Sequence, residues 1–253
     1  MAVIPARMAS SRFPDKPLVP IMGLPMVEHV RRRAMLAKGI DEVVVATCDQ
    51  VIMDAVLEAG GMAILTSDQH ERATERVAEA MRSLTGDVVV VVQGDEPLLH
   101  PDDLQLVIQP FKERQDLSAV CLLSPLDGAE DVTNPNIVKA ACDQEEFVMF
   151  FTRAEIPYPQ KPGTGPVFRE TGIRAFWADF LQTYIDLPET PLEHIESVDM
   201  LRLLEHGYRV IGAVTQNRTI GVDHEADVGM VEDVLKTDPV QRALLERILV
   251  ENS

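Results

Sequence analysis

Five consecutive valines, Val88 to Val92, constrain the fold of this chain more than any other feature. An uninterrupted β-branched run is typical of a central parallel strand covered by helices on both faces, because a half-exposed antiparallel strand alternates apolar and polar residues. The run ends in Gln93-Gly94-Asp95-Glu96-Pro97, so carboxylates are expected at the carboxyl end of the strand. Open α/β sheets bind their ligands at that end.

The spacing of apolar residues predicts strands and helices that alternate on either side of this run. Before it, strands are predicted at residues 1–4, 41–47 and 62–66, and helices at 26–38, 50–59 and 74–84. After residue 117, strands are predicted at 117–123, 136–142, 147–152, 168–177 and 209–214, and helices at 178–185, 191–204 and from 239 onward. This order predicts an α/β fold: a Rossmann-like, doubly wound, mostly parallel sheet with an antiparallel insertion.

Length and composition narrow the class of protein. A chain of 253 residues can bury one substantial core, so a single domain over residues 1–253 is expected. No run of about 18 apolar residues is present, and the chain begins directly with a strand-like segment, so we expect a cytoplasmic protein without a membrane span. Its three widely spaced cysteines predict neither a disulfide framework nor a zinc site.

The formal net charge of −18 argues against a nucleic-acid-binding surface, which needs a cationic footprint. The charge is unevenly distributed, because residues 1–40 contain seven Arg or Lys and only two acidic residues. A cationic segment in an acidic protein suits a small polyanion better than a polymer.

The loop after the first predicted strand carries three cations, two serines and several prolines within residues 4–18. Three cations and two hydroxyls supply what a triphosphate requires, since such donors can spread over its oxygens and their charge favours a leaving pyrophosphate. Neither the glycine spacing of a dinucleotide fingerprint nor a Walker A sequence is present. On local composition alone, a solvated loop with incidental cations is the alternative.

Asp95 is the candidate ligand of a magnesium ion, and Asp223 could complete the site, although it lies too far along the chain for spacing to show this. Asp95 follows the valine strand, and Asp223 follows the predicted strand 209–214 in Gly221-Val222-Asp223. Mg²⁺ prefers oxygen ligands and takes one or two protein carboxylates, leaving positions for phosphate and water. An acidic turn at Asp95 and a helix-capping role for Asp223 are the alternatives.

A further polar segment, His70 to Arg76, lies between a predicted strand and helix. Its Arg76 and Thr74 could contact a nucleotide, and a helix cap with a solvated face is the alternative. The histidines of the chain show no metal-binding spacing, so zinc hydrolysis lacks support.

Ten segments in order resemble one known family, the 3-deoxy-manno-octulosonate (Kdo) cytidylyltransferases, or CMP-Kdo synthetases. They are IPARMASSRFPDKPL, MVEHV, VVVATCD, HERATER, VVQGDEPLL, NPNIVKA, FFTRAEIPY, GIRAF, PLEHIESVDMLRLLEHG and GVD, from about residue 3 to residue 228. The resemblance implies a nucleotidyltransferase that joins CMP from CTP to a sugar acid and releases pyrophosphate, for lipopolysaccharide or capsule biosynthesis. It further implies a homodimer, with dimerisation through a subregion within about 117–190.

The resemblance also implies roles for individual residues. Lys16, Asp95 and Asp223 would be catalytic, with the two aspartates as Mg²⁺ ligands. Arg7, Ser10 and Lys16 would bind the triphosphate, and Arg76 and Gln93 the cytosine or ribose. The implied acceptor-binding residues are Arg153, Thr171, Arg174, Glu196 and Asp199.

The departures from the family pattern concern the acceptor. Arg72-Ala73 stands where the family usually has Ser-Gly, Arg174 where it has an aromatic residue, and Asp199-Met200 where it has Glu-Gln. We therefore expect Kdo first and keep an 8-amino-Kdo, another sugar acid or a phosphonate as alternative acceptors. A CTP-binding regulatory protein without catalysis is the alternative from a different class, and a dinucleotide-dependent oxidoreductase is a more distant one.

Overall fold

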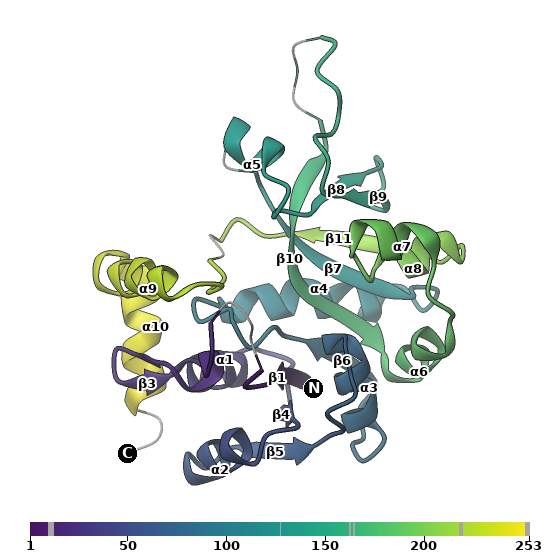
Figure 1. Ribbon diagram of the computed structural model, residues 1–253. Coiled ribbons are helices and arrows are strands. Elements are labelled where there is room, and N and C mark those ends of the chain that lie inside the picture. The colour runs from purple at the N-terminus through teal and green to yellow at the C-terminus, as the bar shows by residue number, and fades with distance from the viewer. Residues whose placement is uncertain (10–12, 127, 162, 164, 218–219, 251–253) are drawn as a thin grey trace. The chain divides into compact units, whose positions relative to one another are not determined.

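The valine run forms strand β6 (Val88–Val91), in which Val89, Val90 and Val91 are fully buried, as predicted. The computed structural model describes residues 1–9, 13–126, 128–161, 163, 165–217 and 220–250 (Figure 1). The chain divides into two compact units, the first comprising Met1–Gln105 with Thr219–Ser253 and the second Leu106–Arg218. The second unit contains the whole predicted subregion 117–190. Its role in dimerisation stays a prediction.

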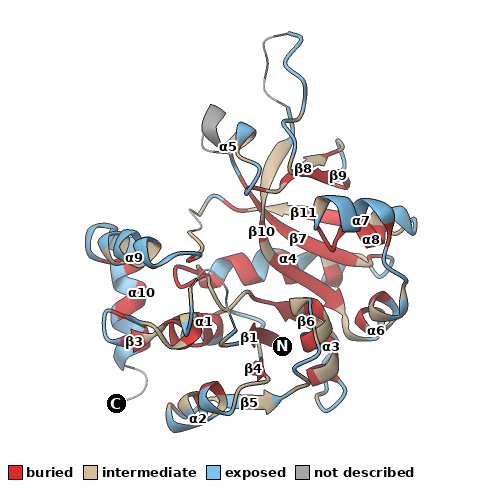
Figure 2. Ribbon diagram, in the orientation of Figure 1, coloured by how far each residue is buried: buried red, intermediate tan, exposed pale blue. Residues whose placement is uncertain are grey.

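The first unit is built on a parallel sheet with strand order β6-β1-β4-β5. Its other strands are β1 (Ala2–Ala6), β4 (Val43–Thr47) and β5 (Met62–Leu65), joined through helices α1 (Met26–Met35), α2 (Gln50–Glu58) and α3 (Ala73–Met81). Because such crossovers are right-handed, α1 and α2 lie on one face and α3 on the other. The strands β1 and β4 are accordingly buried along their whole length (Figure 2). The predicted doubly wound sheet is confirmed.

The remaining elements of the first unit lie around its loops. A 3-10 turn, η1 (Lys16–Leu18), and the short strands β2 (Pro20–Ile21) and β3 (Leu24–Pro25) follow the cationic loop. Helices α9 (Glu225–Thr237) and α10 (Pro239–Val250) belong to the same unit. Their apolar residues Val231, Leu235, Leu245 and Ile248 share a buried cluster with Ile21, Leu24, Met26, Leu98 and Val222.

The second unit has a mixed sheet centred on β7 (Ala119–Ser124), which is buried along its length (Figure 2). Strand β10 (Val167–Trp177) pairs with β7 antiparallel, and β11 (Val210–Val214) pairs with it parallel. Strand β8 (Lys139–Cys142) pairs antiparallel with β10 and with β9 (Val148–Thr152). Helices α5 (Ala129–Thr133), α6 (Ala178–Asp186), α7 (Pro191–Glu196) and α8 (Leu201–Glu205) complete the unit. The expected antiparallel insertion is confirmed.

Two features of the helices differ from the sequence prediction. The helix predicted at 191–204 is two helices, α7 and α8, because Ser197 adopts a left-handed conformation with φ 53° that ends α7. Helices α4 (Pro101–Glu113) and α9 were not predicted, and α4 contains Pro110, which would normally interrupt a helix. Within the described residues, no helix has the length and apolar character that crossing a membrane requires.

Candidate functional site

A cleft of about 490 Å³ opens at the carboxyl ends of β1 and β6. Strand β1 has β4 on one side and β6 on the other, so the order of the strands reverses there, and α/β sheets bind ligands at such a reversal. The lining residues that the structure describes all belong to the first unit. The lining includes Arg7, Lys16, Arg72, Arg76, Gln93, Asp95 and Asp223.

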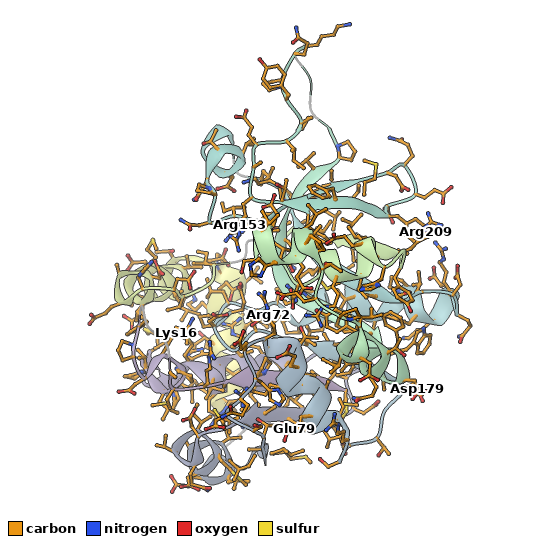
Figure 3. All side chains as sticks on the ribbon, turned by 45° about the vertical axis from the view of Figure 1, so that its right-hand side comes forward. Lys16, Arg72, Glu79, Arg153, Asp179 and Arg209 are labelled. Carbon is orange, nitrogen blue, oxygen red and sulfur yellow. The ribbon has the colours of Figure 1, made fainter. Side chains whose placement is uncertain are left out.

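Lys16, which is labelled in Figure 3, has hydrogen bonds to two segments that are far from it in sequence. Its Nζ donates to Asp95 Oδ2 at 2.7 Å and to the Val222 carbonyl at 2.9 Å. The Val222 amide in turn donates to the Asp95 carbonyl at 2.9 Å, so Asp223 directly follows a residue fixed to Asp95. The structure therefore brings Lys16, Asp95 and Asp223 to one cleft, as the sequence predicts.

Two local conformations make this meeting possible. Asp15 has a left-handed conformation with φ 58°, and its carbonyl accepts from the Leu18 amide at 3.0 Å, which forms the turn that begins with Lys16. Gly94 lies so close to the end of β1 that a Cβ atom there would be 3.0 Å from the Pro5 carbonyl oxygen. Glycine is needed because the backbone after β6 packs directly on the backbone of β1.

Comparison with known proteins identifies the family. A family model described as cytidylyltransferase matches residues 1–217. The chain belongs to the cytidylyltransferase family. The resemblance to the CMP-Kdo synthetases inferred from the sequence is also confirmed by relatives of nearly full length.

Two of these relatives differ in the acceptor that they are named for. A 3-deoxy-manno-octulosonate cytidylyltransferase of Fusobacterium nucleatum is 38% identical over 95% of this chain and 98% of its own. An 8-amino-3,8-dideoxy-manno-octulosonate cytidylyltransferase of Shewanella piezotolerans is 37% identical over 93% of this chain and 98% of its own. A solved CMP:2-keto-3-deoxy-manno-octonic acid synthetase in complex with CTP is 35% identical, with a TM-score of 0.89, over 94% of this chain and 98% of that one. The chain is thus a nucleotidyltransferase.

The two carboxylates of this cytidylyltransferase fit Mg²⁺ better than a metal that needs a full protein cage. Asp95 is 34% exposed and Lys16 contacts one of its two oxygens, while the side chain of Asp223 is exposed. Among the described residues, no group of three or more His, Cys, Asp or Glu side chains could hold a metal ion. Two carboxylates next to an open cleft suit an ion that keeps most of its positions for phosphate and water.

The other predicted nucleotide-binding residues have different environments. Arg7 and Gln93 line the cleft, and Ser10 lies outside the described residues. Arg76 lines the cleft too, but its Nη1 donates to Thr66 Oγ1 at 2.6 Å and to the Ser67 carbonyl at 3.1 Å. Arg76 therefore also holds the loop that precedes α3.

The same loop is fastened by a second contact, which sequence reasoning missed. Glu79 of α3 accepts from the Ser67 amide at 3.0 Å and from His70 Nε2, and the hydrogen bond from His70 is the main cause that lowers the pKa of Glu79 (Figure 3). His70, Glu71 and Arg72 line the cleft. Arg72, which stands where the family usually has a serine, was the sequence feature that indicated a difference in this segment.

The five predicted acceptor-binding residues all belong to the second unit, where four of them form two pairs, Arg153 with Glu196 and Arg174 with Asp199. Glu196 accepts from Thr152 Oγ1 at 2.6 Å and from the Arg153 amide at 2.8 Å, and Arg153 Nε donates to the Glu196 carbonyl at 2.8 Å. Thr171 Oγ1 donates to the Leu122 carbonyl at 3.0 Å. These polar groups already have protein partners.

Arg174 belongs to a buried ion cluster. Its Nη1 donates to Asp199 Oδ2 at 2.6 Å and its Nε to Glu170 Oε1 at 3.1 Å, and all three side chains are nearly buried. Burial alone would lower the pKa of Arg174, but the carboxylates of Asp199 and Glu170 outweigh it and raise that pKa. The Arg174 charge is therefore balanced within the second unit.

Proposed function

We propose that this cytidylyltransferase transfers CMP from CTP to 3-deoxy-manno-octulosonate. The observation that carries the proposal is the convergence of Lys16, Asp95 and Asp223 at the strand reversal, in a chain whose solved relative holds CTP. The second candidate acceptor is 8-amino-3,8-dideoxy-manno-octulosonate, which the name of the Shewanella relative and the altered residues Arg72, Arg174 and Asp199 favour.

The proposed reaction forms a bond from the anomeric hydroxyl oxygen of the acid to the α-phosphorus and breaks the bond to the β-phosphate. Lys16 and Arg7 would stabilise negative charge on the triphosphate and on the leaving pyrophosphate. Asp95 and Asp223 would hold Mg²⁺, which when bound polarises the phosphoryl oxygens. Gln93 and Arg76 would bind the cytosine or ribose of the nucleotide.

The acceptor would contact the second unit through Arg153, Thr171, Arg174, Glu196 and Asp199. Since Arg174 is neutralised by Glu170 and Asp199, this cluster offers no uncompensated cation to the acid. One guanidinium faces two carboxylates in this cluster, which is a reason to test a zwitterionic acceptor such as the 8-amino sugar beside Kdo.

The test is pyrophosphate release from CTP and Mg²⁺ with a panel that contains Kdo, the 8-amino sugar, a nine-carbon sugar acid and a phosphonate. We expect turnover with one of the first two acids and none after Asp95→Asn. CTP binding without turnover on any acid would instead support a CTP-binding protein without catalysis.

We further propose that the protein is a homodimer through the region 117–190 and works in the cytoplasm, where CTP is available. Two large apolar side chains of the second unit support the dimer, because Tyr158 is 82% exposed and Met149 is 59% exposed. Sedimentation analysis should give twice the mass of one chain, and Tyr158→Ser with Met149→Ser should shift the protein towards monomer. A wild-type protein that sediments as a monomer at all concentrations would refute the dimer.

A further inference from the structure

Helix α10 places one buried amide, Gln241, against the segment that follows Asp95. Gln241 is 7% exposed, and its Nε2 donates to the Leu98 carbonyl at 3.0 Å. Its Oε1 accepts from Arg33 Nη1 at 2.7 Å, and the same Nη1 donates to the Leu99 carbonyl at 3.1 Å. A single amide thus connects α1, α10 and the chain three residues beyond Asp95.

Both halves of the amide are needed for this contact. Arg33 is fully buried, and its Nε and Nη2 have no hydrogen-bond partner within the described part of the chain, so its charge depends on the Gln241 and Leu99 oxygens. The Leu98 carbonyl can only accept, so it needs the NH₂ group of the amide. An apolar side chain would satisfy neither partner, and a carboxylate only Arg33.

The contact lies at the downstream end of the loop that carries Asp95. The upstream end is fixed where Gly94 packs on the Pro5 carbonyl. Leu98 shares its buried cluster with Val222, whose carbonyl accepts from Lys16. A shift of Leu98 would therefore move Asp95 relative to Lys16 and Asp223.

We infer that Gln241 is a positioning residue: it holds the segment after Asp95 in place, so that the Asp95 carboxylate is correctly oriented to bind the metal beside the triphosphate. The inference rests on the proposed function. The cytidylyltransferase family model matches residues 1–217, so it ends before α10 begins. Groups that hydrogen-bond directly to a metal ligand typically change metal affinity about 10-fold to 100-fold, and Gln241 acts through the backbone three residues beyond Asp95, so we expect the lower end of that range.

The test compares Gln241→Leu and Gln241→Glu with the wild type. Mn²⁺ binding in the presence of CTP is measured by electron paramagnetic resonance, and amide hydrogen exchange of the peptide spanning residues 93–99 is measured without ligand. We expect both variants to bind Mn²⁺ about tenfold more weakly and to exchange faster in that peptide. Gln241→Glu keeps the acceptor for Arg33, so it should stay folded if Gln241→Leu does not.

Leu244→Ala is the matched control, because Leu244 is buried on the same helix and only its packing is lost. It should lower the melting temperature and leave Mn²⁺ affinity and exchange of residues 93–99 unchanged. Wild-type Mn²⁺ affinity together with wild-type exchange in Gln241→Glu would overturn the inference. Neither readout needs turnover, so a wild type that releases no pyrophosphate with any acid would refute the proposed function alone.

Discussion

The Lys16 side chain contacts both the Asp95 and the Val222 segments at the cleft, so its removal should affect the cleft before it affects the fold. Lys16→Ala removes a cation beside the triphosphate and should lower kcat about 100-fold to 1000-fold, as loss of a charge-stabilising donor does in other enzymes. Steady-state pyrophosphate release measures this change. Lys38→Ala, at an exposed lysine of the same unit, is the control and should have wild-type kcat. A Lys16→Ala enzyme within threefold of wild type would remove Lys16 from the mechanism.

His29 should make the stability of the protein depend on pH. Its Nε2 donates to the Ile21 carbonyl at 2.8 Å and its Nδ1 has no hydrogen-bond partner among the described residues, so the buried ring is neutral. Burial is the main cause that lowers its pKa from 6.5 to about 4. As pH falls, the unfolded chain therefore binds this proton first, and stability that is complete above pH 6.5 is lost between 6.5 and 4.

The expected loss between pH 7.5 and pH 5 is about 2 kcal/mol of unfolding free energy. Urea unfolding of wild type and His29→Gln at the two pH values measures it, because glutamine can keep the donation to Ile21 without titrating. Equal pH dependence in the two proteins would show that His29 does not cause it.

At the level of elements, the ion cluster that Arg174 of β10 forms with Glu170 and Asp199 should increase the free energy of unfolding, because each buried charge has a partner of opposite sign. Arg174→Met leaves the nearly buried carboxylates of Glu170 and Asp199 without their cation, and removing one partner of a buried ion pair typically costs about 3 kcal/mol or more. Urea unfolding should show this loss, whereas Asp179→Asn, at an exposed position on α6, should stay within about 0.5 kcal/mol. Similar stabilities for the two variants would mean that the cluster is not important for folding.

The parallel strands of the first unit and the helices that connect them could be predicted well because apolar periodicity and glycine-marked ends agree with the final packing. The strands β1, β4, β5 and β6 and the helices α1 to α3 lie within a few residues of their predicted bounds. The prediction of one continuous helix over residues 191–204 was wrong, because nothing in the sequence indicates the left-handed conformation of Ser197 that ends α7. Helix α4 was missed because Pro110 lies inside it.

The sequence predicted which side chains gather at the site better than it predicted the backbone groups that hold them there. Lys16 and Asp95 could be expected to meet, because loops at the carboxyl ends of parallel strands share one edge of a sheet. Asp223 could be added only from the resemblance to the CMP-Kdo synthetases, because it is too far along the chain for spacing to place it. The Val222 carbonyl, which accepts from Lys16, could not be predicted, because any residue carries a carbonyl. The bonds of Arg153 with Glu196 and of Arg174 with Asp199 depend on tertiary packing that spacing does not reveal.

For the whole molecule, the metal should be required for turnover and dispensable for folding. The described residues contain no group of three or more candidate ligands, so the ion would be held jointly with the nucleotide. EDTA should abolish pyrophosphate release, and added Mg²⁺ should restore it. The melting temperature without nucleotide should stay unchanged within about 1 °C in EDTA, measured by differential scanning calorimetry. A large drop in the melting temperature would reveal a structural metal instead.

The central claim is that Asp95 and Asp223 hold one divalent ion against a triphosphate that Lys16 contacts. A crystal structure with CTP and Mn²⁺ tests it most directly, because the anomalous signal locates the ion independently of the refined protein atoms. We expect an anomalous peak within coordination distance of both carboxylates, with the CTP phosphates in the cleft beside Lys16. An ion bound away from both aspartates, or CTP bound outside this cleft, would contradict the account.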